Sequence, residues 1–542
     1  MYNTVSNIPK PVNEPIFSYA PNTTPRRLLQ EALQQLEGET LDIPLIIGGR
    51  EIRTGKTGSC IQPHAHSRSL GQFHKAGPKE VHLAIEASQK AKKDWENLSF
   101  PQRASIFLKA ADLLSSTYRY WVNAAAMLNL SKNVFQAEID SACELIDFWR
   151  FNAWYMQELY KDQPLYSTGG TLNGVEYRPL EGFVFAVTPF NFVSIGGNLC
   201  TAPAMLGNTV LWKPASTAVY PAYWVMKILQ EAGLPDGVIN FVPGAGADVG
   251  DPALASPLFA GLHFTGSTEV FQSMWKTIGG RIADYKSYPR VVGETGGKDF
   301  MVAHASADPE ATIAAIIRGA YEYQGQKCSA LSRMYIAKSL WKTIKEPLIE
   351  QIQSIRIGPP QEFGHFMNAV IDKASFTNTQ GYIDRAAASP SARILVGGGC
   401  DDRTGYFIEP TLIETDDPHY ETMEQELFAP VLTAYIYDDA DYDAALRLCD
   451  QTSPYGLTGC VFARDRYAIA QALEALRHSA GNFYINDKPT GAVVGQQPFG
   501  GGRGSGTNDK AGSMLNLLRW VSVRTIKETF TPPSDYRYPF MD

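Results

Sequence analysis

Long apolar runs are missing from this sequence of 542 residues, and no stretch approaches the roughly 18 apolar residues of a membrane-spanning helix. Residues 1–27 also lack the apolar core of a secretory signal. They contain several prolines and no arginine before Arg26, unlike an amphipathic transit peptide. We therefore expect a cytoplasmic protein with no membrane partner.

Cysteine is scarce, and its spacing shows no pairing. There are seven cysteines, an odd number, and no C-x-x-C pair, which argues against a disulfide framework and a structural zinc site. His64 and His66 form an H-x-H pair, but no cysteine or carboxylate cluster accompanies them. A surface loop after Pro63 is therefore the favoured interpretation over a metal site. We expect a reducing compartment and no metal.

Positive charge is in deficit, with 48 Lys and Arg against 56 Asp and Glu and a net charge of −8. That balance disfavours nucleic acid as a partner. An anionic substrate would need a local binding site rather than a global field. Hydrophobic residues make up 44% and charged residues 19%, as in folded globular proteins, and the length predicts two or three domains.

The spacing of apolar residues predicts helices in the first 160 residues. One is expected at about 24–37, and three follow in a row near 81–95, 106–114 and 136–160. A short strand region is expected at 45–52.

From about Val175, short apolar runs alternate with helical segments. Strands are expected at 182–188, 209–212, 238–242 and 261–264, and helices at 197–206, at 220–232 and after Gly266. A second alternating set is expected as strand 300–303, helix 309–324, strand 333–336, helix 340–354 and more elements from 393 to 461. Both sets predict parallel sheets covered by helices, and the first is a dinucleotide-binding pattern in outline.

Three residues suggest chemistry at a carbonyl group. Cys328 lies in the polar loop GQKCS, and a thiolate is a strong nucleophile that can later leave from a thioester. Glu294 lies in GETGGK, where a carboxylate could deprotonate the water that hydrolyses such a thioester. Asn191 in TPFNF could donate to a developing oxyanion, together with the backbone N–H of Cys328. Taken singly, an inert buried cysteine, a solvated glutamate and an ordinary turn asparagine are the alternatives.

The dinucleotide signal is weaker. No G-x-G-x-x-G is present, and 244–250 comes close but is one residue too long. The segment 264–268, FTGST, ends a predicted strand and opens a helix, where free N–H groups can hold a pyrophosphate. The glycine run 500–504 lacks the ending of a P-loop and is interpreted as a flexible loop.

Seven motifs in order resemble the aldehyde dehydrogenase superfamily. They are TPFNF at 188–192, WKPA at 212–215, FTGS at 264–267, GETGGK at 293–298, GQKCS at 325–329, EQELFAPV at 424–431 and PFGG at 498–501. The step of 34 residues from Glu294 to Cys328 (328 − 294) also matches that superfamily. Four further segments resemble its branch that oxidises L-glutamate γ-semialdehyde: 137–155, 180–192, 481–501 and 505–512.

The resemblance implies an α/β fold with a Rossmann-type cofactor domain, an α/β catalytic domain and a small β oligomerisation flap. The expected boundaries are 1–159 and 179–293 for the NAD-binding domain, 294–490 for the catalytic domain, and 160–178 with 503–542 for the flap and C-terminal tail. A homodimer or a higher homo-oligomer is expected by the same analogy.

The resemblance also implies residue roles. Cys328 would attack the aldehyde, Asn191 would stabilise the oxyanion and Glu294 would activate water. The residues expected to contact NAD are Thr188, Lys213, Gly266, Ser267, Glu426 and Phe428. Ser216 stands where many NAD-specific members carry a glutamate that repels a 2′-phosphate, which leaves room for some NADP use.

For the substrate, the resemblance implies an anion nest at the backbone of residues 491–492. The expected substrate-binding residues are Ser329, Gly491, Ala492, Phe192, Phe499 and Glu144. Ala492 replaces a serine expected in this branch, a change that a backbone contact would tolerate. The two phenylalanines could instead be core residues, and Glu144 could be a solvated helix residue.

The expected activity is NAD-dependent oxidation of L-glutamate γ-semialdehyde to glutamate through a cysteine thiohemiacetal and a thioester. Two alternatives stay open at this point: a dehydrogenase of another small acidic semialdehyde such as succinate semialdehyde, and a catalytically silent structural paralogue.

Overall fold

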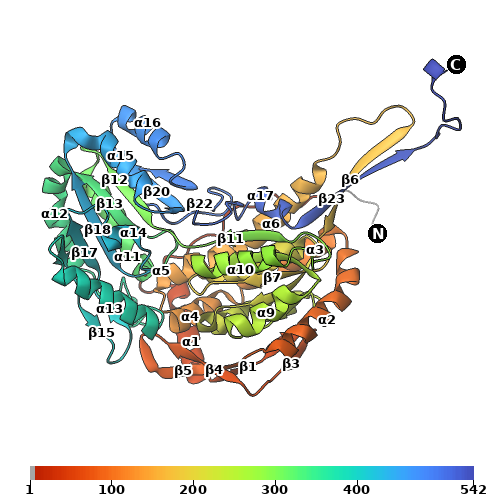
Figure 1. Cartoon of the computed structure of the whole chain (residues 1–542). Helices are drawn as coiled ribbons and strands as arrows, with labels where there is room; N and C mark the ends of the chain where they lie inside the picture. The colour runs from red at the N-terminus through yellow and green to blue at the C-terminus, as the bar shows by residue number, and fades with distance from the viewer. Residues whose placement is uncertain (1–5, 542) are drawn as a thin grey trace.

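Two seven-stranded sheets lie on opposite sides of the molecule in the computed structural model, which describes residues 6–541 (Figure 1). The strands of the first sheet, in spatial order, are β11 (Arg290–Glu294), β10 (Phe259–Thr265), β7 (Phe183–Val187), β8 (Thr209–Lys213), β9 (Ile239–Phe241), β2 (Leu45–Ile47) and β3 (Arg50–Ile52). The strands β7 to β11 run parallel, and β2 and β3 add an antiparallel edge. The parallel sheet predicted from the alternation after Val175 is confirmed.

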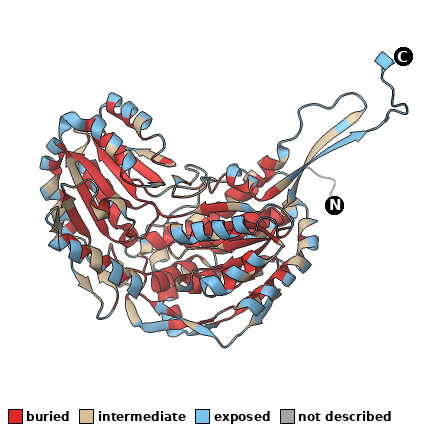
Figure 2. Ribbon diagram, in the orientation of Figure 1, coloured by how far each residue is buried: buried red, intermediate tan, exposed pale blue. Residues whose placement is uncertain are grey.

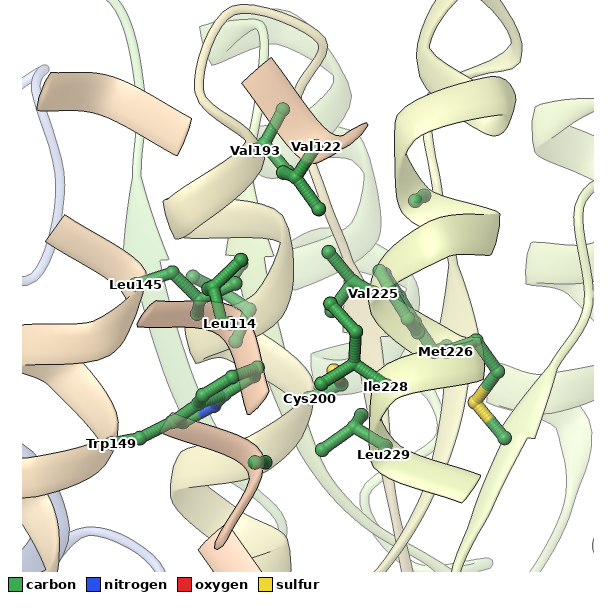
Figure 3. Packing of buried hydrophobic residues seen from close by; sticks show 14 of the residues in the cluster. Leu114, Val122, Leu145, Trp149, Val193, Cys200, Val225, Met226, Ile228 and Leu229 are labelled. Carbon is green, nitrogen blue, oxygen red and sulfur yellow. The ribbon is translucent and has the colours of Figure 1, made fainter. Parts of the chain in front are cut away.

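Helices cover both faces of this sheet, so its strands are apolar on both sides. They are α7 (Val193–Met205), α8 (Val219–Ala232), α9 (Gly246–Ala255) and α10 (Thr268–Gly280). In β7, Val184 and Ala186 pack with α7 and α8, while Phe183 and Phe185 pack with α9 and α10. Figure 3 shows the first of these clusters, with side chains from the neighbouring helices interlocking.

The N-terminal helices form an outer layer on the first sheet. They are α1 (Thr24–Gly38), α2 (Pro78–Glu96), α3 (Phe100–Ser115), α4 (Arg119–Leu130), α5 (Val134–Ala137) and α6 (Glu144–Lys161). The expectation of three consecutive helices after the strand region was wrong, because α4 was missed. Ten of its twelve residues are buried, so it has no polar stripe and no periodic signal.

A π-helical segment, η1 (Glu138–Cys143), joins α5 to α6 in what was predicted as one regular helix. π-helical turns are rare and occur mostly at functional sites. This one buries two acidic side chains, Glu138 and Asp140. The Glu138 carboxylate pairs with Arg119, and the Asp140 carboxylate pairs with Lys132 at 2.7 Å.

A three-stranded sheet, β1 (Leu41–Ile43), β5 (Ala65–His74) and β4 (Thr57–Gln62), lies beside the helical layer. The predicted surface loop after Pro63 was wrong for His64, which is buried and lies 3.0 Å from the Ser131 hydroxyl. His66 belongs to β5 and lies 2.8 Å from the Asp402 carbonyl. Over residues 6–541, no group of His, Cys, Asp or Glu is arranged to hold a metal ion.

The second sheet follows the same parallel design. Its strands, in spatial order, are β14 (Ala392–Val396), β17 (Thr411–Thr415), β18 (Val431–Tyr437), β13 (Leu331–Ala337), β12 (Asp299–Ala303), β20 (Thr458–Phe462) and β21 (Asn482–Ile485). Only β14 is antiparallel. Its helices are α11 (Pro309–Tyr321), α12 (Lys338–Gln353), α13 (Lys373–Ala388), α14 (Glu421–Glu424), α15 (Tyr442–Gln451) and α16 (Arg466–Ala475). Both sheets are buried (Figure 2).

A long two-stranded ribbon projects away from this body, with the C-terminus beyond its far end (Figure 1). It pairs β6 (Thr171–Pro179) with β23 (Val521–Thr529) in an antiparallel ladder. The remaining short elements are η2 (Ser216–Ala218), η3 (Glu322–Gly325), η4 (Asp439–Asp441), η5 (Pro539–Met541), β15 (Cys400–Asp401), β16 (Phe407–Ile408), β19 (Tyr455–Gly456), β22 (Gly502–Arg503) and α17 (Met514–Leu518). None of the helices within residues 6–541 has both the length and the apolar character to cross a membrane.

Trp149 of α6 tests the packing between the helical layer and the first sheet. It is fully buried, and its indole N–H donates to the Thr201 hydroxyl of α7 at 3.0 Å. We expect Trp149→Ala to lower the free energy of unfolding by about 3–5 kcal/mol, measured by urea denaturation. Trp275→Ala, at a side chain 47% exposed, is the matched control and should cost far less. Equal losses in the two variants would contradict this account of the core.

Candidate functional site

The turn before Cys328 has an unusual backbone. Tyr323, Gln324 and Gly325 have positive φ angles of 51°, 57° and 67°. A Cβ atom on Gly325 would lie 2.3 Å from the Ala429 carbonyl oxygen, so only glycine fits there. The Tyr323 hydroxyl donates to the Leu130 carbonyl at 3.0 Å. Consecutive residues with a left-handed backbone are strained. They persist only where many surrounding contacts hold them in place, as at many functional sites.

Cys328 lies where two cavities meet. One has a volume of about 540 Å³ and is also lined by Glu294. The other has a volume of about 710 Å³ and is also lined by Asn191. Cys328 lines both, so an electrophile in the first cavity and a second molecule in the other can both reach its sulfur atom. The structure therefore brings together the three residues that the sequence singled out for chemistry.

Glu294 ends β11 and faces the smaller cavity with a carboxyl group that is only partly paired. Its Oε2 atom is buried without a hydrogen-bond partner among the described residues. Space for the group depends on Gly500, where a Cβ would lie 2.9 Å from Oε1. Burial raises the pKa of Glu294 well above its usual value, and nearby Lys510 opposes that shift. Such a group can take up a proton near neutral pH.

The surroundings of Cys328 favour the neutral thiol. Burial and the carboxylates of Asp299 and Glu294 raise its pKa well above the usual value. The Cys328 backbone N–H makes no hydrogen bond to another residue of the described chain. The Asn191 amide group donates one hydrogen bond to the Gln326 carbonyl at 3.1 Å, which holds it beside the same turn. Two donors therefore lie next to the sulfur atom, as an oxyanion hole requires.

The larger cavity lies between α9, α10 and the carboxyl ends of β7 and β8. All six residues expected to contact NAD line it: Thr188, Lys213, Gly266, Ser267, Glu426 and Phe428. The N-terminus of α10 opens onto it, where unpaired N–H groups and the helix dipole attract anions. Two atoms expected to face the pyrophosphate already have partners, since the Gly266 N–H donates to the Glu294 carbonyl and the Ser267 hydroxyl accepts from the Val270 N–H.

Lys213 and Glu426 place polar groups at different parts of this cavity. Lys213 ends β8, and burial lowers its pKa. Glu426 accepts a hydrogen bond from the Gly297 N–H at 2.9 Å, and burial raises its pKa to about 7. Phe428 has a φ of 55° and sets its ring edge-on to Phe190 at 5.8 Å. Hydrogen-bonding groups, an anion-binding helix end and an apolar wall suit a dinucleotide.

The sequence analysis missed one wall of this cavity. The segment 244–250 was set aside as a weak motif, yet Gly246, Ala247 and Gly250 of α9 line the cavity. The available signal was a strand followed by glycines at the start of a helix. The spacing of these glycines differs from that of the G-x-G-x-x-G motif. Ser216 is exposed and lines a separate cavity of about 220 Å³ rather than the larger one.

The smaller cavity contains all six residues expected to bind the substrate: Ser329, Gly491, Ala492, Phe192, Phe499 and Glu144. The Ser329 and Thr490 hydroxyls lie 2.8 Å apart. Gly491 has a φ of 93°, and neither its N–H nor that of Ala492 makes a hydrogen bond within the described chain. Free adjacent backbone amides form an anion-binding nest.

Two buried ionisable side chains lie at this cavity, Glu144 in its lining and Lys132 behind Phe192. Glu144 accepts a hydrogen bond from the Ser194 hydroxyl, and burial raises its pKa to about 8, so it is not a solvated helix residue. Lys132 is fully buried, with its Nζ atom 4.8 Å from the centre of the Phe192 ring. Burial lowers the pKa of Lys132 to about 8, against the attraction of Asp140.

A segment near the N-terminus, residues 13–16, forms another part of this cavity that the sequence analysis missed. Asn13, Glu14 and Ile16 line it, although they lie more than 100 positions from every other lining residue. No local signal could have revealed this, because the segment is irregular and has no periodicity.

Comparisons with known proteins agree with this geometry. Residues 52–526 match the model of the aldehyde dehydrogenase family. The chain is 54% identical to the mitochondrial delta-1-pyrroline-5-carboxylate dehydrogenase of Dictyostelium discoideum, over 99% of this chain and 96% of that one. It is 50% identical to the enzyme of that name from Agaricus bisporus, over 98% and 97%.

Solved structures give the same result. The delta-pyrroline-5-carboxylate dehydrogenase of Mycobacterium tuberculosis bound with NAD superposes with a TM-score of 0.96 at 49% identity, covering 100% of both chains. The 1-pyrroline-5-carboxylate dehydrogenase from Thermus with bound NAD superposes with a TM-score of 0.90 at 32% identity, over 97% of this chain and 100% of that one. With the match to the family model, these likenesses show that this chain belongs to the aldehyde dehydrogenase family.

Proposed function

We propose that this protein is an NAD-dependent dehydrogenase that oxidises L-glutamate γ-semialdehyde to L-glutamate, the second step of proline catabolism. The semialdehyde is in equilibrium with 1-pyrroline-5-carboxylate. The observation that carries the proposal is Cys328 at the junction of two cavities, one lined by Glu294 and an anion nest and the other suited to a dinucleotide. The names of the relatives at 54% and 50% identity support the choice of substrate.

The reaction begins at the sulfur atom. The Cys328 thiol loses its proton to a base, and Glu294, which faces the same cavity, is placed to accept it. The sulfur then bonds to the aldehyde carbon and forms a thiohemiacetal. The Asn191 amide and the Cys328 N–H donate to the resulting oxyanion, and each such donor is worth about 2.7–4 kcal/mol.

NAD, when bound, supplies the acceptor for the hydride that leaves the thiohemiacetal carbon, and a thioester remains on Cys328. Glu294 passes the proton from Cys328 to solvent, and as a carboxylate again it takes a proton from water, whose oxygen attacks the thioester carbon. Loss of the thiolate releases the carboxylic acid. The overall reaction consumes one water and one NAD⁺ and yields one acid, one NADH and a proton. Thr188, Lys213, Gly266, Ser267, Glu426 and Phe428 would hold NAD in the larger cavity.

The smaller cavity would recognise the amino-acid end of the substrate. The N–H groups of Gly491 and Ala492 would bind the α-carboxylate, with help from the Ser329 hydroxyl. A backbone contact explains why alanine is tolerated at 492. Phe192 and Phe499 would flank the aliphatic chain, and Glu144 would face the substrate from the cavity lining.

We further propose that the chain is divided into domains with separate roles. Residues 1–159 and 179–293 would hold NAD, residues 294–490 would supply the catalytic groups, and residues 160–178 with 503–542 would form an oligomerisation flap and tail. A reducing compartment stays a prediction. Cytoplasm stays a prediction, because the Dictyostelium relative is named mitochondrial.

Replacing the proposed nucleophile tests the function directly. We expect wild-type protein to produce NADH from L-glutamate γ-semialdehyde, and Cys328→Ala to lose at least about a thousandfold in kcat, because no thiohemiacetal can form. NADH absorbance is the measurement. Cys400→Ala, at a half-exposed cysteine in the short β15 strand, should retain full activity.

Two outcomes would favour the alternatives. Comparable kcat/KM for succinate semialdehyde, which has no α-ammonium group and carries its carboxylate one carbon nearer the aldehyde, would point to another small semialdehyde as the substrate. No NADH from any aldehyde would favour a catalytically silent paralogue.

Glu294 should give the reaction a pH dependence. Its active form is the carboxylate, and burial raises its pKa, so the active fraction grows as the pH rises through that raised value. We expect kcat to rise with pH through that raised pKa, and Glu294→Gln to lower kcat by about 10²–10⁴ and flatten the profile. If the variant kept the rise, the titrating group would be another one, such as Cys328.

The flap should control assembly. Leu172 and Ile526 are 55% and 44% exposed and lie on one face of the β6–β23 ribbon, where a second copy could cover them. We expect wild type to sediment as a dimer or a higher oligomer and Leu172→Glu/Ile526→Glu to shift the protein toward the monomer. Leu473→Glu, at a side chain 45% exposed on α16, is the control. A monomeric wild type would contradict the proposal.

A further inference from the structure

An extended N-terminal arm, residues 8–20, lies across η1 and α6 beside the smaller cavity. It has no helix or strand, and its two buried side chains, Ile8 and Tyr19, lie at its two ends. The Ile8 N–H donates to the Gln157 side chain at 2.6 Å. At the other end, the buried Tyr19 hydroxyl donates to the Glu138 carboxylate at 2.7 Å. The arm is therefore fixed on both sides of the residues that reach the cavity.

Glu14 fixes the middle of the arm. Its backbone N–H donates to the Asp147 carboxylate of α6 at 2.8 Å. Its own carboxylate lies between two arginines, 2.6 Å from Arg119 and 2.5 Å from Arg150. Arg119 is almost fully buried and also packs over the Phe17 ring at 3.9 Å. Charged groups paired in so buried a place leave the arm little freedom to shift.

Asn13 uses this fixed position to make a bridge. Its side-chain amide group donates to the Asp147 carboxylate at 2.8 Å and to the Val494 carbonyl at 2.8 Å. Its side-chain carbonyl accepts from the Gln496 side chain at 2.9 Å. One side chain thus connects the arm with α6 and with a loop 481 positions away in the sequence.

That loop, residues 490–497, is the anchor loop, because it carries the free N–H groups of Gly491 and Ala492. It has no regular secondary structure, and Gly491 and Gly495 have φ angles of 93° and 81°. Val494 packs against Phe148 and Phe151 of α6, but apolar packing does not set the direction of a backbone. The hydrogen bond from Asn13 to the Val494 carbonyl is directional, and it lies two residues from Ala492.

We propose that Asn13 is a positioning residue for recognition of the substrate's α-carboxylate. The arm holds Asn13, Asn13 holds the anchor loop at Val494, and the loop presents its free N–H groups to the cavity. This inference rests on the proposed function and extends it: the selectivity for an amino-acid aldehyde depends on a segment outside both sheets. Asn13 takes no part in the chemistry at Cys328.

The test separates this role from a purely structural one. Asn13→Ala should raise KM for L-glutamate γ-semialdehyde roughly five- to tenfold, as expected for two lost hydrogen bonds that orient the loop, and leave kcat within about twofold. The kcat/KM for propanal, which has no carboxylate, should change less than about twofold. Asn97→Ala, at an exposed asparagine whose side-chain amide donates to the Lys93 carbonyl, is the matched control and should change neither. Equal losses for both aldehydes would overturn the proposal.

A second measurement does not depend on the substrate. Hydrogen–deuterium exchange of the anchor-loop amides should speed up several-fold in Asn13→Ala and stay unchanged in Asn97→Ala. Unchanged exchange in Asn13→Ala would overturn the inference. The proposed function and the bridge can fail separately. If exchange is faster in Asn13→Ala but the wild type does not prefer the semialdehyde to propanal, the bridge is upheld and the proposed function is refuted.

Gln496→Ala provides a milder variant should Asn13→Ala fail to fold. Gln496 is exposed and donates to the Asn13 side-chain carbonyl, so its loss frees that side chain to rotate. We expect a smaller rise in KM for the semialdehyde with no change for propanal. No rise in KM, or an equal change for both aldehydes, would count against the proposal.

Discussion

Close approach of backbones from the two halves of the molecule is the constraint on which this site depends. A Cβ on Gly297, just after β11, would lie 2.1 Å from the Cys328 carbonyl oxygen. A Cβ on Gly325 would clash with the Ala429 carbonyl. Without Gly297, the segment after the first sheet could not approach the backbone of Cys328, and without Gly325 the turn that carries the nucleophile could not pack against the segment before β18 of the second sheet. The meeting of two cavities at one sulfur atom follows from that contact.

Some of the buried polar atoms without partners lie around the same place. Glu294 Oε2, Lys298 Nζ and Asp299 Oδ2 are buried without hydrogen-bond partners among the described residues. Burial lowers the pKa of Lys298 to about 7 and raises that of Asp299 well above its usual value. Such groups cost stability, and active sites are where proteins retain them. The large apolar clusters behind both sheets offset this cost (Figures 2 and 3).

Much of the architecture could be predicted, because parallel strands buried on both faces leave strong local signals. The runs at 183–187 and 210–212 are apolar throughout, and turn residues lie close to them. The helix α4 could not be predicted, because it is buried on all sides and has no polar face. The π-helical turn η1 was missed for another reason: its sequence reads as ordinary helix, and only its tertiary ion pairs show why an extra residue is accommodated.

The sequence by itself determined which residue types are available for chemistry and in what order. A nucleophile, a base or a glycine that permits a close backbone approach is specified by the residue at one position. It also determined the two alternating sets that build the sheets, because periodicity is local. Tertiary structure alone decided that Asn13 and Val494 lie side by side, and that α9 walls the larger cavity. It also decided that the Gly266 N–H is already bonded and that Glu144 is not solvated. The physical reason is that hydrogen bonds and burial join residues hundreds of positions apart, and no window of sequence contains both partners.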